Sequence, residues 1–165
     1  MKHLLFLFIF ITTIDSHASI PSTSEVRILY QKAAVNEEDC TKLIELLSSP
    51  NQNFSPFYVG YKGCATMIEA KYKLNPWSKY SYFNKGRKLL EEAITKDKEN
   101  IELRFLRFTI QTKAPSFLGY SKNIEDDKAA ILRDLNKVTD RSLKLLIISF
   151  LSKSTYLSNT EKSNL

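Results

Sequence analysis

GRKLLEEAITKDKEN, residues 86–100, is the stretch of sequence that most constrains the fold. Gly86, Leu90 and Ala93 recur at the i, i+4, i+7 spacing of one helix face. Two of the three are small, so this face allows the neighbouring helix of a hairpin to approach closely. Asp97 begins the polar run that ends the helix before the next helix starts. The stretch therefore predicts a closely packed helical hairpin.

The same stretch resembles the second helix and exit turn of a tetratricopeptide repeat, in which a small residue, a large apolar residue and an alanine precede an Asp-Pro-type turn. Gly86, Leu90, Ala93 and Asp97 occupy those positions, and Lys98 stands where the repeat usually has proline. The resemblance covers about one repeat of 34 residues, and it implies stacked helical hairpins. An irregular bundle with a single repeat-like hairpin is the alternative.

The rest of the chain is also predicted to form helices joined by short loops. Apolar residues recur at helical spacing, and Asn36, the pair Asn75-Pro76 and Asp140 are typical helix starts. The predicted helices span residues 24–34, 37–47, 56–74, 76–96, 100–111, 124–138 and 141–153. No segment shows the alternation of a strand. The expected class is all-α, with about seven helices in antiparallel hairpins and tetratricopeptide-repeat-like stacking.

Residues 1–18 predict a secretory signal peptide. Lys2 supplies a basic start, an apolar run extends from Leu4 to Ile14, and Ser16 and Ala18 fit a small-x-small cleavage site. The apolar run is shorter than the roughly 20 residues that a membrane anchor needs. We therefore expect cleavage near Ala18, a periplasmic or secreted protein, and no stable membrane insertion after cleavage.

Loss of this leader would remove both histidines, His3 and His17. A chain without histidine lacks Ser-His-Asp and Cys-His catalysis and any His-ligated metal site. Phosphate-cradling glycine loops and Cys-x-x-Cys motifs are missing from the sequence too. We accordingly expect no enzyme activity, no cofactor and no metal.

The composition indicates one folded domain. The chain has 165 residues, 43% of them hydrophobic, and its 24 Lys and Arg against 18 Asp and Glu give a net charge of +6. This apolar content argues against global disorder, so we expect one helical domain at residues 19–153 and a flexible tail at 154–165. An exported protein rarely meets nucleic acid, so none is expected as a partner, and anionic lipid or polysaccharide would be attracted only diffusely.

Aromatic residues gather between Phe54 and Phe83, and one helix face cannot bury them all. We expect Tyr58, Trp77 and Tyr80 to be at least partly exposed. Exposed Tyr and Trp are typical of the residues that dominate protein interfaces, which makes these three candidates for partner binding. The alternative is a tyrosine-rich core whose hydroxyls reach the surface.

Arg104, Arg107 and Gln111 form a second candidate set, because the i, i+3, i+7 spacing places them on one helix face. Arginine offers a planar, bidentate fork for carboxylates, so this face would suit an acidic peptide or a C-terminal carboxylate. The alternative is ion pairing within the protein, with Glu69, Glu91, Glu92 or Glu102 as partners.

Cys40 and Cys64 lie on consecutive predicted helices. In an oxidising compartment they would form a disulfide if their Cα atoms came within about 7 Å. Two independent small core residues are the equal alternative.

Three longer stretches, NPWSKYSYFNKG (75–86), ELRFLRFTIQ (102–111) and FLGY (117–120), resemble an uncharacterised family of small exported helical proteins of Bacteroidota. The resemblance covers most of the mature chain and implies export and a helical fold. It carries over no catalytic or binding residue.

These observations favour a non-enzymatic, exported, helical-repeat-like protein that binds an unidentified protein or peptide partner in the cell envelope. A first alternative is that the aromatic cluster encloses an apolar pocket for a small ligand. A second is a histidine-free hydrolase that uses two carboxylates. The acidic runs are more typical of solvated helix starts, so the hydrolase is the least favoured.

Overall fold

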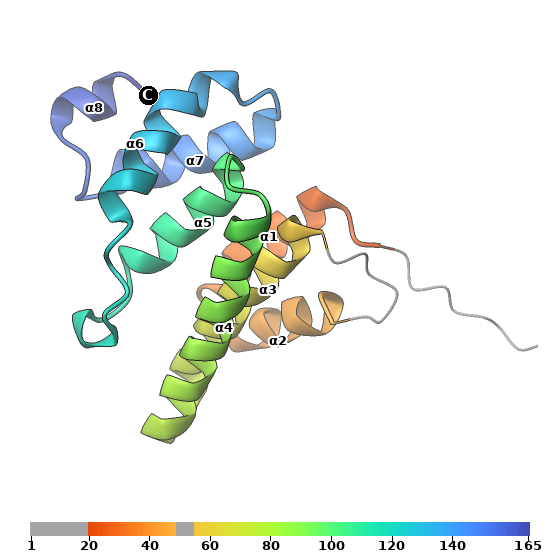
Figure 1. Ribbon diagram of the computed structural model, residues 1–165. Coiled ribbons are helices and arrows are strands. Elements are labelled where there is room, and N and C mark those ends of the chain that lie inside the picture. Colours follow the sequence, from red (N-terminus) through yellow and green to blue (C-terminus); the bar gives the residue numbers. More distant parts are fainter. Residues whose placement is uncertain (1–19, 49–54) are drawn as a thin grey trace, which may run out of the picture.

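The computed structural model describes residues 20–48 and 55–165, and this part of the chain contains helices and loops but no strand, which confirms the all-α class (Figure 1). The predicted signal peptide lies outside the described residues. The elements are α1 (Thr23–Ala33), α2 (Glu37–Leu46), α3 (Pro56–Glu69), η1 (Ala70–Tyr72), α4 (Pro76–Lys96), α5 (Ile101–Gln111), η2 (Ser116–Leu118), α6 (Ile124–Asp134), η3 (Leu135–Lys137), α7 (Arg141–Lys153) and α8 (Asn159–Ser163).

Polar caps set the starts of the helices, and the predicted caps are confirmed. Asn36 accepts a hydrogen bond from the N–H of Asp39 at 3.0 Å, and Asn75 accepts one from the N–H of Trp77 at 2.8 Å. Asp140 caps α7 in the same way. Each such cap stabilises its helix by roughly 1 kcal/mol. The predicted helices at 56–74 and 124–138 end earlier, as α3 and α6, and each continues as a 3-10 turn.

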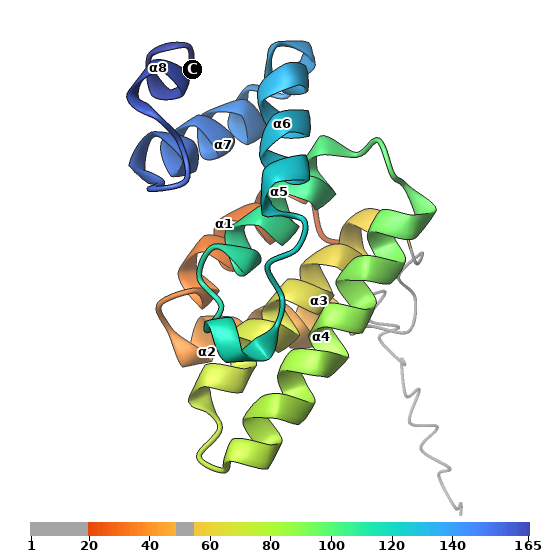
Figure 2. The ribbon, with the colours of Figure 1, turned by 60° about the vertical axis from the view of Figure 1, so that its left-hand side comes forward.

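Helices α3 and α4 form a closely packed hairpin and run side by side in two views (Figures 1 and 2). Gly63 and Gly86 lie where the two helices cross. A Cβ built on Gly63 would lie 2.7 Å from the carbonyl oxygen of Gly86 and 2.8 Å from the amide nitrogen of Leu90. Only hydrogen fits between the two backbones at this point, which is the close approach that the small residues predicted.

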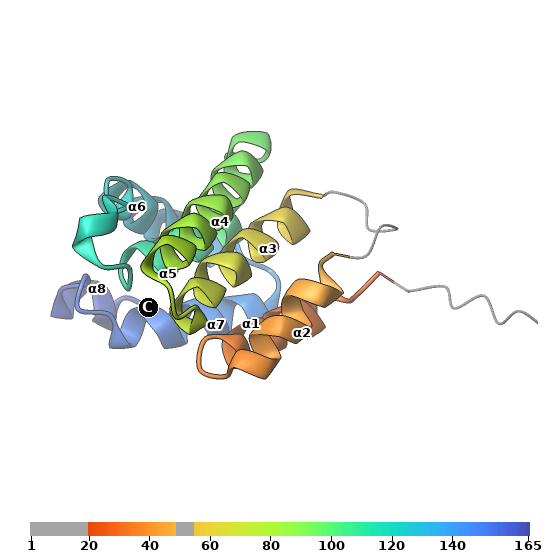
Figure 3. The same cartoon turned by 90° about the horizontal axis from the view of Figure 1, so that it is seen from below.

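Two hydrophobic clusters form the core, and α5 contributes to both. Leu103 and Leu106 pack with residues of α1 to α4. Phe105 and Phe108, from the other face of α5, pack with residues of α6 and α7. All four side chains are at most 1% exposed. Helix α5 accordingly lies between the α3–α4 hairpin and the α6–α7 pair (Figures 1 and 3).

The C-terminal segment differs from the flexible tail that the sequence led us to expect. After a turn, Ser158 and Glu161 form a reciprocal capping box that starts α8. Leu157 is 5% exposed and belongs to the second hydrophobic cluster, and Leu165 packs against the same cluster. Burial of these two leucines stabilises the conformation in which the polar segment folds back onto α6 and α7.

Candidate functional site

The arginine-bearing face of α5 points into the protein, so the prediction that it is a free partner-binding surface is wrong. Arg107 is 6% exposed and Gln111 is 2% exposed. Arg104 keeps a 23% exposed side chain, but its Nε donates to the carbonyl oxygen of Lys98 at 2.9 Å. The two interpretations of this face were a surface for a partner and ion pairing within the protein, and the structure corresponds to ion pairing within the protein.

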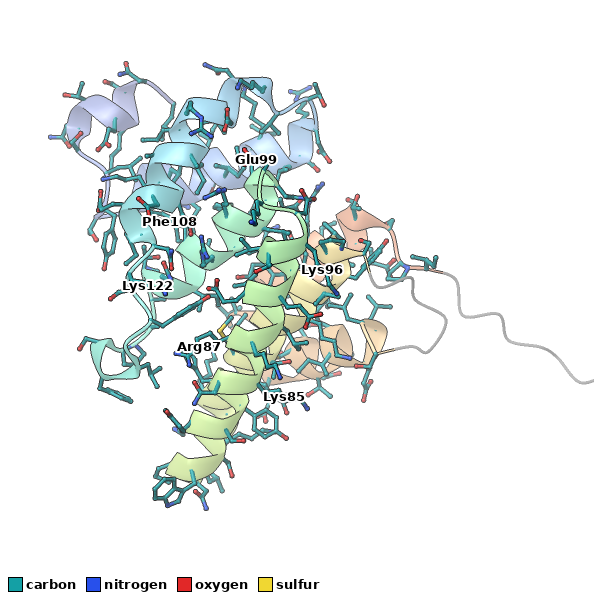
Figure 4. The ribbon with its side chains drawn as sticks, viewed as in Figure 1. Lys85, Arg87, Lys96, Glu99, Phe108 and Lys122 are labelled. Carbon is teal, nitrogen blue, oxygen red and sulfur yellow. The ribbon has the colours of Figure 1, made fainter. Side chains whose placement is uncertain are left out.

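Arg107 joins α5 to α4 and α6 through charge-assisted hydrogen bonds, which we call the Arg107 network. Its Nε donates to Oδ2 of Asp127 at 2.7 Å and its Nη2 to Oδ1 at 2.8 Å, while its Nη1 donates to Oε2 of Glu91 at 2.8 Å. The hydroxyl of Tyr120 donates to Glu91 at 2.6 Å, and burial together with this hydrogen bond raises the pKa of Tyr120 above its usual range. The guanidinium of Arg87 lies 5.8 Å from the centre of the Tyr120 ring, and Figure 4 shows Arg87 on α4. The Asp127 carboxylate, 0% exposed, takes its compensating charge mainly from Arg107 and also from Arg104, whose Nη1 lies 3.4 Å from Oδ1.

A second buried arginine, Arg27 of α1, forms an equivalent arrangement that the sequence analysis did not identify. Its Nε and Nη2 donate to the two carboxylate oxygens of Glu102 at 2.6 and 2.8 Å, and its Nη1 donates to Asp140 at 2.6 Å. The Tyr61 hydroxyl also donates to Glu102, at 2.6 Å, and burial and this carboxylate raise the pKa of Tyr61. Hydrogen bonds from Ser142 and Arg27 lower the pKa of Asp140. Both arginines therefore hold helices together, and neither offers a free guanidinium.

Gln111 lies one helical turn beyond Arg107 and is the least satisfied polar side chain in this region. Its Oε1 and Nε2 are buried and, among the described residues, have no hydrogen-bond partner. The Oδ1 of Asn123, one turn before Asp127, is likewise buried without a hydrogen-bond partner among the described residues. A buried amide without partners costs about 1–3 kcal/mol.

Replacing Gln111 by methionine, which has a similar unbranched shape, is expected to raise the free energy of unfolding by about 1–2 kcal/mol, because the buried polar atoms are removed. Urea unfolding followed by circular dichroism measures the change. The exposed Gln31, replaced by methionine, serves as the control and should leave stability nearly unchanged. A marked loss of stability in Gln111→Met alone would show that the amide has partners in solution.

The three candidate aromatic residues divide into two kinds. Trp77 and Tyr80 are 82% and 55% exposed, as expected. Tyr58 is half-buried, and its hydroxyl donates to the carbonyl oxygen of Pro21 at 2.8 Å. Tyr61, another member of the aromatic cluster, is fully buried against the rings of Tyr30 and Phe57, so it packs into the core.

Cys40 and Cys64 are both buried and both free, so the structure corresponds to two separate core residues rather than to a disulfide. Burial raises the pKa of the Cys40 thiol to about 11 and raises that of Cys64 further. Because the thiolate is the reactive form, both side chains are poor nucleophiles at neutral pH.

A groove of about 800 Å³ opens between α1, α3, α5 and α7, at the boundary between the two hydrophobic clusters. We call it the central groove. Apolar side chains, among them Phe150 and Tyr156, line it together with several hydroxyls and three exposed lysines, Lys71, Lys113 and Lys153. None of its described lining residues is an Asp or a Glu. Lys113 and Lys153 have no ion-pair partner within the described part of the chain.

A smaller groove of about 480 Å³ lies beside the central groove and shares with it lining residues of α3 and α5. We call it the lateral groove. The first turns of α4 form one side, with Lys79 and Tyr80, and the η2 turn forms the other, with Phe117. Its described lining residues also include no acid.

The described residues contain no group of three or more His, Cys, Asp and Glu side chains that could hold a metal ion. The two most buried carboxylates, Asp127 and Glu102, are engaged by the arginines. Neither groove thus provides the paired carboxylates that a histidine-free hydrolase would use. Over residues 20–48 and 55–165, no helix is long and apolar enough to cross a bilayer.

Comparison with protein-family models, with curated proteins and with solved structures finds no match to this chain.

Proposed function

We propose that the protein is an exported, non-enzymatic binding protein whose central groove holds an acidic, amphipathic helix of a protein or peptide partner. One observation carries the proposal: the groove combines an apolar floor with three exposed lysines and no described acidic lining residue. The signal-peptide pattern of the first 18 residues supports export.

The chemistry of the groove favours a partner that is both apolar and negatively charged. Val35 and Tyr156, at its edge, are 82% and 40% exposed, so an occupant would remove apolar surface from water. Unpaired lysines at the same groove attract carboxylates and repel basic segments. An amphipathic helix lying in a groove between helices satisfies its own backbone hydrogen bonds, which suits a lining built entirely from helices and their connections.

Stacked helical hairpins of the tetratricopeptide-repeat kind are part of the same proposal. The backbone contact between Gly63 and Gly86 and the capped turns between helices support it. In such stacks, the concave surface that successive repeats form together is the usual binding surface.

A fluorescently labelled peptide of leucine and glutamate, designed as an amphipathic helix, tests the proposal by fluorescence anisotropy with the full chain. The double variant Lys113→Glu/Lys153→Glu is expected to bind at least about tenfold more weakly, which corresponds to roughly 1.4 kcal/mol. Both lysines are exposed, so the fold should be kept, and circular dichroism verifies this.

A matched double variant, Lys85→Glu/Lys88→Glu, changes the net charge equally at two exposed residues of α4 that do not line the groove. Figure 4 shows the position of Lys85. This matched variant should bind the peptide nearly as well as the unaltered chain. Equal weakening in both double variants would contradict the proposal, because it would indicate diffuse attraction. Equal affinity for a peptide with lysine in place of glutamate would contradict it as well.

A further inference from the structure

A set of large apolar side chains stands exposed at the end of the α3–α4 hairpin, and the fold makes little use of it. Leu74 is 98% exposed and Trp77 is 82% exposed. Tyr80, on the next turn of α4, is 55% exposed. Across the lateral groove, Phe117 of η2 is 84% exposed. We call these four residues the hairpin tip.

The two segments that form the hairpin tip carry positive charge only. Residues 70–90 contain five lysines, one arginine and no acidic residue, and residues 112–122 contain two lysines and no acidic residue. Lys71, Lys79 and Lys113 line the lateral groove beside the exposed aromatic rings. Lys73 is paired with Glu69, which lies on the α3 side of the turn.

The part of this region that carries Leu74 and Trp77 is a projection outside the lateral groove. The end of the hairpin extends beyond the neighbouring helices in two views (Figures 1 and 2). A projecting end cannot enclose a small ligand, whereas it can touch a broad, flat surface. Tryptophan and tyrosine are enriched where a bilayer meets water, because their rings prefer the boundary between headgroups and acyl chains. Lysines near such rings are attracted to anionic headgroups.

We propose that the hairpin tip docks the protein onto the surface of a lipid bilayer that carries anionic headgroups. Leu74, Trp77 and Phe117 enter the boundary between headgroups and acyl chains. Lysines of the lateral groove contact the headgroup phosphates. The attachment is peripheral and reversible, because only side chains at one end of the molecule take part. Lys113 lines both grooves, whereas Leu74, Trp77 and Phe117 do not line the central groove, so the vesicle experiment changes none of the residues that the binding experiment on the central groove alters.

Trp77 is the single tryptophan of the chain, so its intrinsic fluorescence reports on the hairpin tip directly. Vesicles of phosphatidylcholine mixed with phosphatidylglycerol are expected to shift its emission to shorter wavelength and to protect it from acrylamide quenching. Vesicles of phosphatidylcholine alone should do so more weakly, and added salt should reduce the effect. The double variant Leu74→Ser/Phe117→Ser should need at least about tenfold more lipid for the same shift.

The control variant Ile28→Ser/Leu145→Ser removes two other exposed apolar side chains, 52% and 56% exposed, and should bind vesicles as the unaltered chain does. The proposal is overturned if vesicles leave the emission and quenching of Trp77 unchanged. It is overturned too if the protein sediments with vesicles while Trp77 stays accessible to acrylamide, or if the control weakens binding as much. An emission shift that depends on protein concentration without lipid would assign the tip to a second copy of the chain instead.

Discussion

Replacing Asp127 by alanine is expected to lower the free energy of unfolding by about 3–5 kcal/mol, because the guanidinium of Arg107 would stay buried without its bidentate partner. Arg107 is 6% exposed and Asp127 is 0% exposed, so water cannot take the place of the carboxylate without rearrangement of α5 and α6. Glu91 would still accept one hydrogen bond from Arg107. Urea unfolding of the full chain, followed by far-ultraviolet circular dichroism, measures the loss.

Asp134→Ala is the matched control on the same helix. Asp134 pairs with Arg133 and Lys137, both well exposed, so its loss should change stability little. The double variant Arg107→Met/Asp127→Leu removes both buried charges together and should recover much of the loss, since apolar side chains can replace a buried ion pair. If Asp127→Ala were no more harmful than Asp134→Ala, the Arg107 network would not be holding α5 to α6.

Replacing Gly86 by alanine is expected to lower the free energy of unfolding by about 1–3 kcal/mol, the typical cost of forcing atoms into a packed site. The new Cβ would meet the carbonyl oxygen of Gly63 and lie 2.7 Å from the amide nitrogen of Met67. Both are backbone atoms, so α3 and α4 would have to separate. Alanine is the better helix former by about 1 kcal/mol, and this gain is already included in the net loss. Urea unfolding gives the value.

Gly60→Ala tests the same explanation within α3. There the new Cβ would meet mainly Cδ2 of Leu103, the end of a side chain that can adjust. Its cost should be clearly smaller than that of Gly86→Ala. An increase in stability for Gly86→Ala would contradict the close packing of the hairpin, because only the gain in helix propensity would then remain.

Local patterns in the sequence were sufficient to predict most of the helices, because a helix cap and the spacing of apolar residues each involve only a few neighbouring residues. Asn36, Asn75 and Asp140 start helices as predicted. Helix α8 was missed because it is short and its residues are polar, so no apolar spacing marks it. The Ser158 and Glu161 pair was a usable signal, since Ser-x-x-Glu is the pattern of a capping box.

The candidate site was predictable only in part, because a pattern shows which residues share a face but not what lies against it. The spacing placed Arg107 and Gln111 on one face correctly, but Asp127, which covers that face, is twenty residues away from Arg107. Arg27 gave little signal, since an arginine beside Val26 is also consistent with a solvated helix edge. The central groove joins side chains of four helices and has no counterpart in any local stretch.

Helix α5 contributes side chains to both hydrophobic clusters, and this limits how genetic recombination could divide the chain. A crossover that ended the chain after α5 would leave Phe105 and Phe108 facing water, and one that removed α5 would take Leu103 and Leu106 from the first cluster. Neither piece would keep a complete core. The grooves and the hairpin tip are therefore not exchangeable modules, and recombination can pass them on only with the whole helical domain.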